Sequence, residues 1–445
     1  MSISSTHSLD KSMAKYYTDY RFGDVFVSLT RAPNYLADRI RELPGVARVE
    51  TRVVRSVILD IPQMAEPASC RLVSLSDHPD TMLNGLALLR GRVPNSTGRV
   101  EVIASEQFAD AHGFQPGDQL DVIMAGRREQ LHIVGVAMSP EFVYVTQPGL
   151  LLTDNRRYGI MWMPRRQLEA AFNMEGAFND VVITLRPNAS SKDIMFHVDR
   201  LTASFGGTGA YDRSEQPSHH RVADEMQQAG SMAFVTPTMF LAVATFLFNL
   251  VLSRIVRQQQ EQIATLRAFG FRPGEIGAYY LKLVIILVAG GSLLGCAAAL
   301  PLSWWITGRY VRFFRFPIVI YEFASKEAVF ASLIALLAAL GGSFSAIRRA
   351  QRLPPAVAMR PAAPLADRSS IVECLGLSSF LSPMTSMIVR RLETNKRVTA
   401  FSVLGMAMGL SVLVLGYFFQ DTIDYVTEVQ FERTQRHDVM LTFYE

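Results

Sequence analysis

The chain has 445 residues, of which 49% are hydrophobic and 19% are charged, and its net charge is +4. Soluble domains usually carry about 25% charged residues, so the chain has fewer charged residues than a typical soluble protein. The small net charge decides little, and no nucleic-acid partner is expected. The three cysteines lie far apart, without the spacing of a disulfide framework or a zinc site.

The first half of the chain has the composition of a soluble domain, and its start lacks the apolar core of a signal peptide. Residues 1–20 are expected to be a linker. Residues 21–230 are expected to form an extracytoplasmic α+β domain. The reason is that apolar residues alternate at 24–29 and again at 46–60, on either side of a segment with apolar residues at helical spacing.

Residues for catalysis are not visible in this domain. The sequence contains no GxSxG, HExxH or paired-carboxylate arrangement. His219 and His220 precede Asp224 and Glu225, which could suggest a metal site, but a solvated helix end before the first apolar run is favoured. The sequence therefore predicts no catalytic residue, no cofactor and no metal.

Four later stretches are long and apolar enough to cross a membrane. A bilayer core of ~30 Å needs about 20 apolar residues as a helix, and none of the four has a charged residue in its middle. Small residues recur four apart in three of them, as at Gly342 and Ala346, which either allows close helix packing or reflects their frequency in spans. The predicted spans are 231–256, 281–306, 328–347 and 398–419.

Arginine and lysine between the spans indicate direction, because cytoplasmic loops carry the excess of positive charge. The basic segments 257–280 and 348–397 are therefore expected in the cytoplasm, the second as a linker with an amphipathic helix. The segment 307–327 must then be an external loop although it is basic as well, and this conflict stays open at the level of sequence. Its basic residues are Arg309, Arg312, Arg315 and Lys326.

The two ends of the chain carry similar strand patterns. Aligned at Asp24 and Asp438, DVFVSL and DVMLTF match in character. Since the second pattern follows an outgoing span, residues 420–445 are expected to begin a second extracytoplasmic domain, and a further span is expected upstream of residue 1. The chain is then the middle of a duplicated protein, with chance similarity over six residues as the alternative.

The segment after the first span contains more structure than a short loop needs. Ile263 and Leu266 fall on one side of a predicted helix, and Gly270 is placed to end it, because glycine takes the left-handed conformation at low cost. Pro273 and Glu275 then favour a new helix. The apolar side of the first helix is expected either on the lipid interface or in a groove of a partner protein.

The sequence EQIATLRAFG, followed by a new helix, resembles a loop of FtsX-like (MacB-type) permeases, the membrane subunits of ABC transporters. A second stretch, AIRRAQRLPPAVAMRP, is similar to the exit motif of the same family, and the order of these matches agrees over most of the chain. Gln260 departs from the pattern, which commonly has an arginine there. The matching residues are Glu261, Ile263, Leu266, Arg267, Ala268 and Gly270 in the loop, and Ala346, Arg349, Ala350, Pro355, Ala358, Met359 and Arg360 in the exit motif.

This resemblance implies a permease subunit that crosses the bacterial cytoplasmic (inner) membrane several times, with residues 21–230 outside the cytoplasm. The loop would be a coupling helix that docks on a cytoplasmic ABC ATPase subunit. Its coupling residues would be Glu261, Gln262, Ile263, Leu266, Arg267, Ala268, Phe269 and Gly270. The cytoplasmic exit motif would be formed by Arg349, Pro355, Ala358, Met359 and Arg360.

The duplicated members resemble lipoprotein-release and export systems. The expected cargo is therefore hydrophobic, a lipoprotein or a peptide. Besides the ATPase, the resemblance implies a second permease copy or homologue, the lipid bilayer, and a periplasmic adaptor or lipoprotein as partners.

The residues themselves agree that another chain handles ATP. No GxxxxGK(S/T) motif occurs, so the chain has no ATPase site of that kind and is not expected to be an enzyme. The spans also lack the charged side chains that ion-coupled transporters generally use. The alternative is a membrane-anchored extracytoplasmic ligand-binding sensor or scaffold. A hydrolytic membrane enzyme is a third and weaker interpretation, because no catalytic constellation is visible.

Overall fold

The structure is a computed structural model. It describes residues 2–62, 64, 67–76, 82–96, 98–147, 153–318, 320–321, 325–352, 382, 384–385, 388, 392–393, 396–429 and 433. Apart from the chain ends, it divides into two compact units. The external unit contains Ser2–Gly230 and Ser303–Glu322, and the helical unit contains Ser231–Leu302 and Phe323–Phe443.

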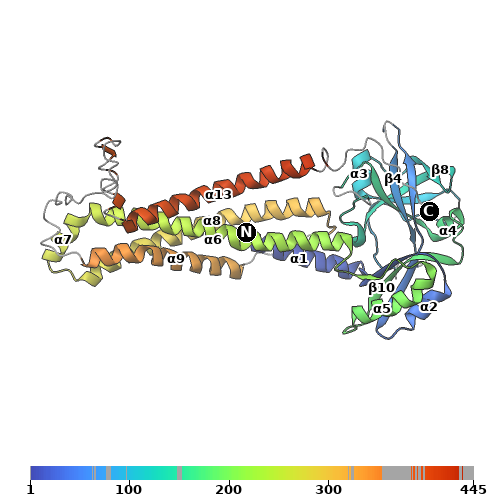
Figure 1. The fold of residues 1–445 in the computed structure, drawn as a ribbon, viewed down its shortest axis with the longest axis horizontal. Helices are drawn as coiled ribbons and strands as arrows, with labels where there is room; N and C mark the ends of the chain where they lie inside the picture. The colour runs from blue at the N-terminus through green and yellow to red at the C-terminus, as the bar shows by residue number, and fades with distance from the viewer. Residues whose placement is uncertain are drawn as a thin grey trace. The chain divides into compact units, whose positions relative to one another are not determined.

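The first part of the external unit, the sheet lobe, is a four-stranded antiparallel sheet in the order β11-β1-β10-β2. Val25 and Val27 of one strand lie opposite Ile183 and Val181 of the next, and all four are buried against two helices. Figure 1 shows both helices beside this sheet. The elements are β1 (Val25–Pro33), α2 (Tyr35–Arg41), β2 (Val46–Arg52), β10 (Ala177–Leu185), α5 (Ser191–Thr202), the 3-10 helix η3 (Ala203–Phe205) and β11 (Tyr211–Asp212).

The second part, the barrel lobe, is a seven-stranded sheet in the order β5-β8-β6-β9-β4-β3-β7 that closes on itself, because β8 also pairs with β7. Alternate residues of its strands point inward, so Leu59, Leu72, Ile133 and Met161 share one core with Phe108. The elements are β3 (Val54–Asp60), β4 (Ala68–Leu75), β5 (Ala87–Gly91), β6 (Glu101–Ser105), α3 (Glu106–His112), β7 (Gln119–Met124), β8 (Arg127–Met138), the 3-10 helix η2 (Pro140–Phe142), β9 (Tyr158–Pro164) and α4 (Arg165–Ala171).

Two elements differ from the sequence expectation. The strand predicted over 46–60 is two strands, β2 and β3, because the chain passes from the sheet lobe to the barrel lobe at Val53. Residues 1–20, expected as a linker, contain the helix α1 (Ser2–Asp19). Leu9, Met13 and Tyr16 recur along it at helical spacing and pack in an apolar cluster of the external unit.

Four helices are long and apolar enough to cross a membrane, which confirms the predicted fold class of an α+β domain followed by a four-helix transmembrane region. The helices are α6 (Pro217–Gln258), α8 (Pro273–Phe314), α9 (Ser325–Arg352) and α13 (Lys396–Glu428). α6 and α8 each have 42 residues, or about 63 Å at 1.5 Å per residue, which exceeds the ~30 Å hydrocarbon core. The predicted spans are shorter because they follow only the apolar runs.

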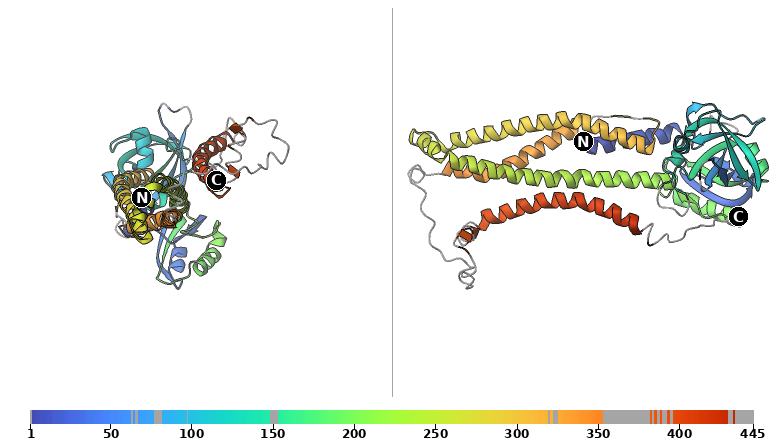
Figure 2. Two further views of the ribbon diagram at one scale, coloured as in Figure 1. Left: turned by 90° about the vertical axis from the view of Figure 1, so that its left-hand side faces the viewer. Right: turned by 90° about the horizontal axis from the view of Figure 1, so that it is seen from above.

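Close packing in the helical unit depends on small residues of α9, which lies beside α6 and α8 (Figure 2). Ala346 is fully buried, and a Cβ atom on Gly342 would lie 2.7 Å from Thr245 of α6. The small-residue face of α9 therefore meets another helix, as its spacing predicts. Gly291 and Gly295 of α8, by contrast, have open space around them.

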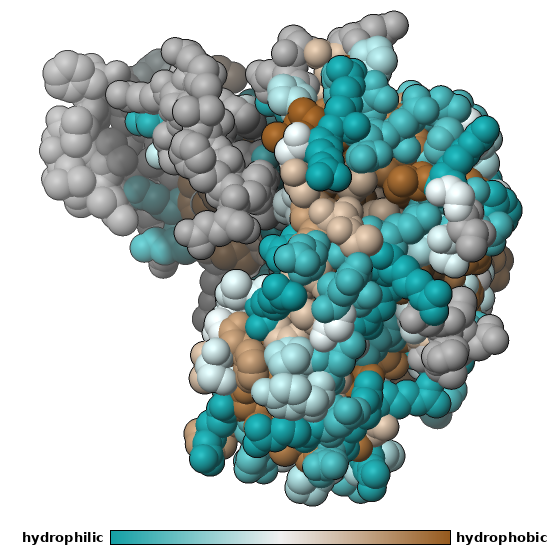
Figure 3. All heavy atoms as spheres, turned by 90° about the vertical axis from the view of Figure 1, so that its right-hand side faces the viewer, coloured by the Kyte–Doolittle hydropathy of each residue, from teal (hydrophilic) through white to brown (hydrophobic). Residues whose placement is uncertain are grey.

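The surfaces of the two units differ in polarity. Leu293, Leu294 and Val329 are among many large apolar side chains exposed on the helical unit. Figure 3 shows a face of the external unit on which hydrophilic side chains prevail and hydrophobic ones are scattered. Scattered apolar residues are normal on a surface in water, whereas extended apolar surfaces are not. The contrast suits the helical unit to lipid and the external unit to water.

A buried ion cluster joins the two lobes of the external unit. Arg52 of β2 donates from Nη2 to Oδ1 of Asp180 at 2.6 Å, and from Nη1 to Oε2 of Glu141 at 2.5 Å. Each of these three side chains is at most 8% exposed. Burial opposes ionisation of Glu141, but the Arg52 guanidinium holds the pKa of that carboxyl below its usual value. Since Asp180 lies in the sheet lobe and Glu141 directly follows the barrel strand β8, the cluster fixes one lobe to the other.

Glu50 of β2 lies beside this cluster. Its Oε2 accepts a hydrogen bond from the backbone N–H of Leu83, while its buried Oε1 has no hydrogen-bond partner in the part of the chain that is described. Burial raises the pKa of Glu50 from 4.5 to about 6, against the lowering effects of the Leu83 hydrogen bond and of Arg52. A carboxyl whose pKa rises on folding stabilises the fold at low pH, and this contribution is lost as the pH rises through about 6.

We expect Arg52→Met to lower the free energy of unfolding of the external unit by about 3–5 kcal/mol, because two carboxylates would remain buried without a cation. Unfolding of the purified protein followed by tryptophan fluorescence measures this loss. Arg128→Met is the matched control, because Arg128 pairs with Asp60 and Asp121 at the exposed surface and such pairs contribute about 0–1 kcal/mol. Equal losses in the two variants would contradict the role of the buried cluster.

For Glu50 we expect an effect of pH. The unfolding temperature of the wild-type protein should rise relative to that of Glu50→Gln as the pH falls from about 6 towards 4.5, because only the wild type takes up the stabilising proton there. Parallel pH profiles of the two proteins across this range would rule out the assignment.

Candidate functional site

The segment between α6 and α8 contains a short helix, α7 (Gln260–Ala268), which ends in the predicted glycine stop. Gly270 has φ +93°, its N–H donates to the carbonyl of Arg267 at 3.1 Å, and the N–H of Phe271 donates to the carbonyl of Leu266 at 3.2 Å. This pair of bonds is a Schellman motif. The glycine stop predicted from the sequence is confirmed, and it leaves few backbone groups free at the helix end.

The restart of the chain as α8 is equally well defined. Pro273 is the first residue of the helix, where its missing N–H is no loss. The side chain of Glu275 accepts from the backbone N–H of Arg272 at 2.8 Å, as in a capping box. The predicted restart at Pro273 and Glu275 is confirmed, and the turn between α7 and α8 has one fixed geometry.

Ile263 and Ala264 hold α7 against the rest of the helical unit. Both are at most 2% exposed, and Ile263 packs in a cluster with Ile276 and Tyr280 of α8 and Ala350 of α9. Two polar contacts add to this packing. The hydroxyl of Tyr280 donates to Oε1 of Gln259 at 2.8 Å, and Arg267 donates to the carbonyl of Gln351 in α9 at 3.3 Å.

Leu266 does not share the buried position of Ile263, contrary to the single anchoring side expected from the sequence. Its side chain is 42% exposed, because α7 turns Ile263 and Ala264 toward α8 and α9. Phe269, Phe271 and Tyr279 are exposed as well, at 80%, 50% and 61%. Three of them, Leu266, Phe271 and Tyr279, help to line a hollow of about 290 Å³, whose lining also includes Gln259, Gln262 and Glu275.

The other predicted coupling residues lie around this exposed surface. Glu261, Gln262 and Ala268 are exposed on α7, and Arg267 is half-buried beneath it. The sequence expectation missed Phe271 and Tyr279. Phe271 could have been found, because the residue after a Schellman glycine often makes an apolar contact with the residue at the position of Leu266.

Only part of the predicted exit motif can be placed. Arg349 is exposed in the last turn of α9, whereas Ala346 and Ala350 are fully buried against the neighbouring helices. Pro355, Ala358, Met359 and Arg360 lie outside the described residues.

The polar residues before the first span do not form a metal site. His219 lies 3.1 Å from the hydroxyl of Tyr17, and His220 lies 3.3 Å from Asp224. Glu225 instead accepts from the hydroxyl of Tyr310. Within the described residues, no group of three His, Cys, Asp or Glu side chains is arranged to hold a metal.

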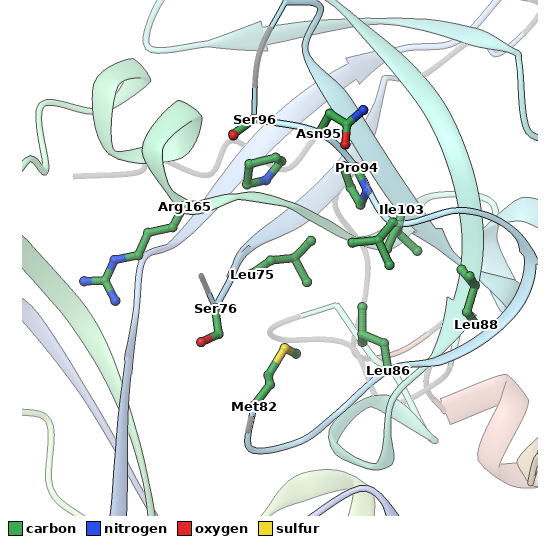
Figure 4. A pocket seen from close by; sticks show the side chains of 12 residues that line it. Leu75, Ser76, Met82, Leu86, Leu88, Pro94, Asn95, Ser96, Ile103 and Arg165 are labelled. Atoms are coloured by element: carbon green, nitrogen blue, oxygen red, sulfur yellow. The ribbon is translucent and has the colours of Figure 1, made fainter. Parts of the chain in front are cut away.

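A second hollow, of about 300 Å³, lies on the barrel lobe. Leu75, Met82, Leu86 and Ile103 converge in it, while the guanidinium of Arg165 points away from them (Figure 4). Arg165 is also paired with Glu169 at 2.7 Å. The hollow can accept an apolar group, but its lining contains no nucleophile with an adjacent base.

Gly270→Val should loosen the turn after α7, because a left-handed conformation costs about 1–2 kcal/mol for a residue with a Cβ atom and more for a β-branched one. We expect faster tryptic cleavage after Arg267 in the purified protein. Gly274→Val is the control, since Gly274 lies in α8 with open space around it and without a positive φ. Cleavage at the same rate in both variants would contradict the prediction.

The chain was compared with known proteins and solved structures. A search among curated proteins gives no match. Similar solved structures include the extracellular domain of the ABC-type transporter YknZ from Gram-positive bacteria (14% identity, 43% of this chain and 98% of that chain, TM-score 0.29). Another is the periplasmic region of MacB from Actinobacillus actinomycetemcomitans (10% identity, 48% of this chain and 97% of that chain, TM-score 0.30).

The family comparison covers the loop after the first span and the exit motif as far as Pro355. Residues 234–355 match the model of the FtsX-like permease C-terminal family. This range includes α7, the Schellman turn, the start of α8 and Arg349. Residues 234–355, about a quarter of the chain, are therefore similar to the C-terminal part of FtsX-like permeases.

Proposed function

We propose that the chain is the membrane subunit of an ABC transporter and that α7 is the element that docks on a separate cytoplasmic ATPase subunit. One observation carries this proposal. Ile263 and Ala264 fix α7 to its neighbours, while Leu266, Phe269 and Phe271 remain exposed around its end. A helix that only filled a loop would bury these apolar side chains or lack them.

The exposed surface suits a protein partner better than a lipid interface. Its apolar side chains surround a hollow, and the polar side chains of Gln262 and Glu275 share the same lining. Aromatic and apolar anchors with a polar rim are typical of protein interfaces. Acyl chains offer nothing to pair with the carboxylate of Glu275. The hollow therefore favours an ATPase groove whose own side chains enter it.

The rigid attachment of α7 to α8 would allow a contact between α7 and the ATPase to move α8. The Schellman turn and the capping contact of Glu275 connect α7 directly to α8, which is one helix from Pro273 to Phe314. A displacement of α7 on ATP binding would thus move α8 instead of being absorbed in a flexible loop. In this proposal the external unit follows α6 and α8, since both helices contribute residues to it.

The role that follows is export or release outside the cytoplasm of a bacterial inner membrane. The proposed cargo is hydrophobic, a lipoprotein or a peptide, and the apolar hollow of the barrel lobe supports an apolar group as part of it. A second permease copy or homologue would complete the transporter, with a periplasmic adaptor or lipoprotein as a further partner.

We expect Leu266→Asp to weaken association with the ATPase by about 2 kcal/mol or more, which is about 30-fold, because a carboxylate would enter an apolar contact. The measurement is co-purification of the ATPase from native membranes, together with the yield of inserted protein. Ile123→Asp is the matched control, because Ile123 has a similar exposure of 44% but lies in the external unit.

Normal ATPase association of Leu266→Asp would overturn the docking assignment. Wild-type protein that carries no ATPase, but binds an extracytoplasmic ligand with full affinity in the absence of ATP, would favour a sensor or scaffold instead.

A further inference from the structure

Arg315 ends α8 with an uncommon backbone conformation. It follows Phe314, the last residue of the helix, and has φ +49°. The N–H of Phe316 donates to the carbonyl of Val311 at 3.2 Å, which is the six-to-one bond of a Schellman motif. Glycine is the usual residue at this position, and Gly270 occupies it at the end of α7. An arginine takes the left-handed conformation only at an energetic cost.

The ion pairs of the Arg315 side chain can offset that conformational cost. Its Nη1 lies 2.8 Å from Oδ2 of Asp110 and 3.2 Å from Oε2 of Glu106. Both carboxylates belong to α3 of the barrel lobe. Asp110 also accepts from Arg90 of β5 at 2.9 Å, so the contact includes a barrel strand as well as α3.

The end of α8 and the helix α3, which this contact joins, are both anchored by buried apolar side chains. Phe314 and Phe316, on either side of Arg315, are buried in a cluster with Tyr16 of α1 and Val222 of α6, and this cluster also includes Ala87 and Met138 of the barrel strands β5 and β8. On the other side, α3 is fixed because Phe108 and Ala109 are fully buried in the barrel core. A displacement of the end of α8 would therefore be transmitted to the barrel lobe.

We infer that Arg315 is the positioning residue through which α8 moves the barrel lobe. This inference rests on the proposed function, in which ATP binding displaces α7 and α8. Phe314 and Phe316 seat the helix end, while Arg315 links it to α3 by charge. The proposal explains why an arginine stands where the backbone favours glycine.

Arg315→Gly separates the backbone turn from the ion pairs. Glycine adopts the left-handed conformation readily, so the substitution keeps the turn and removes only the ion pairs. The test uses the full chain in complex with its ATPase in lipid nanodiscs. Hydrogen exchange of the amides of α3 is measured with and without ATP. Arg128→Gly is the control, since Arg128 pairs with Asp60 and Asp121 in the barrel lobe and none of these residues belongs to α8.

In the wild type and in Arg128→Gly we expect ATP to change the exchange rates of α3. In Arg315→Gly this change should fall by about fivefold or more, the lower end of typical coupling between sites, while ATPase association and the unfolding temperature stay at wild-type values. Arg315→Glu should lose the change as well, and adding Glu106→Arg should restore it, while Asp110 is kept because it also pairs with Arg90.

An ATP-dependent change that persists in Arg315→Gly would overturn the inference and leave the proposed function intact. A wild-type chain that holds no ATPase would overturn the proposed function and the inference with it. If Arg315→Gly unfolds, the charge-reversed double variant Arg315→Glu/Glu106→Arg decides the question. Recovery of the ATP-dependent change in that variant supports a charge link, and failure to recover it refutes one.

Discussion

Inside the hydrocarbon core of a bilayer no water satisfies a free backbone N–H or C=O group, so a helix that enters the core has to stay a helix until it leaves. α6 and α8 meet this condition with 42 residues each. Pro237 and Pro301 stand inside these helices, but both helices continue past them, and the turns with a positive φ that flank α8 lie at its ends. The turn at Gly270 lies just before α8, between α7 and α8, and the turn at Arg315 lies just after the last residue of α8.

These two turns use the same hydrogen-bond pattern for different purposes. At Gly270 the chain uses the residue that fits the backbone and leaves the side chains of Leu266 and Phe271 to form a surface. At Arg315 the residue fits the left-handed backbone conformation less well than glycine does, and its side chain forms ion pairs with Asp110 and Glu106. The turn at Gly270 thus leaves an apolar surface exposed, whereas the turn at Arg315 positions a charged side chain for ion pairs.

The external unit can follow its helices only if its lobes move together. The Arg52 cluster provides that connection, since its carboxylates come from both lobes. It also reaches the start of α6, because the carbonyl of Glu141 accepts from Gln216 at 2.8 Å, just before that helix begins. A buried ion pair of this kind is weak evidence for stability, but it defines one arrangement of the groups it joins.

Local signals were sufficient to predict the apolar spans, the stop at Gly270 and the restart at Pro273. Each depends on residues that are contiguous in the sequence, about 20 for a span and about one helical turn for the stop or the restart. The burial of Ile263 and the exposure of Leu266 could not be predicted in the same way. Both are apolar and three residues apart, and only the positions of α8 and α9 decide between them. The division of the 46–60 strand at Val53 likewise depends on two sheets that the pattern cannot separate.

The basic loop 307–327 was the one feature that contradicted the predicted topology, and its arginine at position 315 has a partner that no local pattern reveals, since Asp110 is 205 positions away. The order of synthesis gives this distance a meaning. Glu106 and Asp110 leave the ribosome long before Arg315, so both carboxylates are already made when the loop emerges. In the folded external unit the positive charge of the arginine is balanced by its contacts with these two carboxylates.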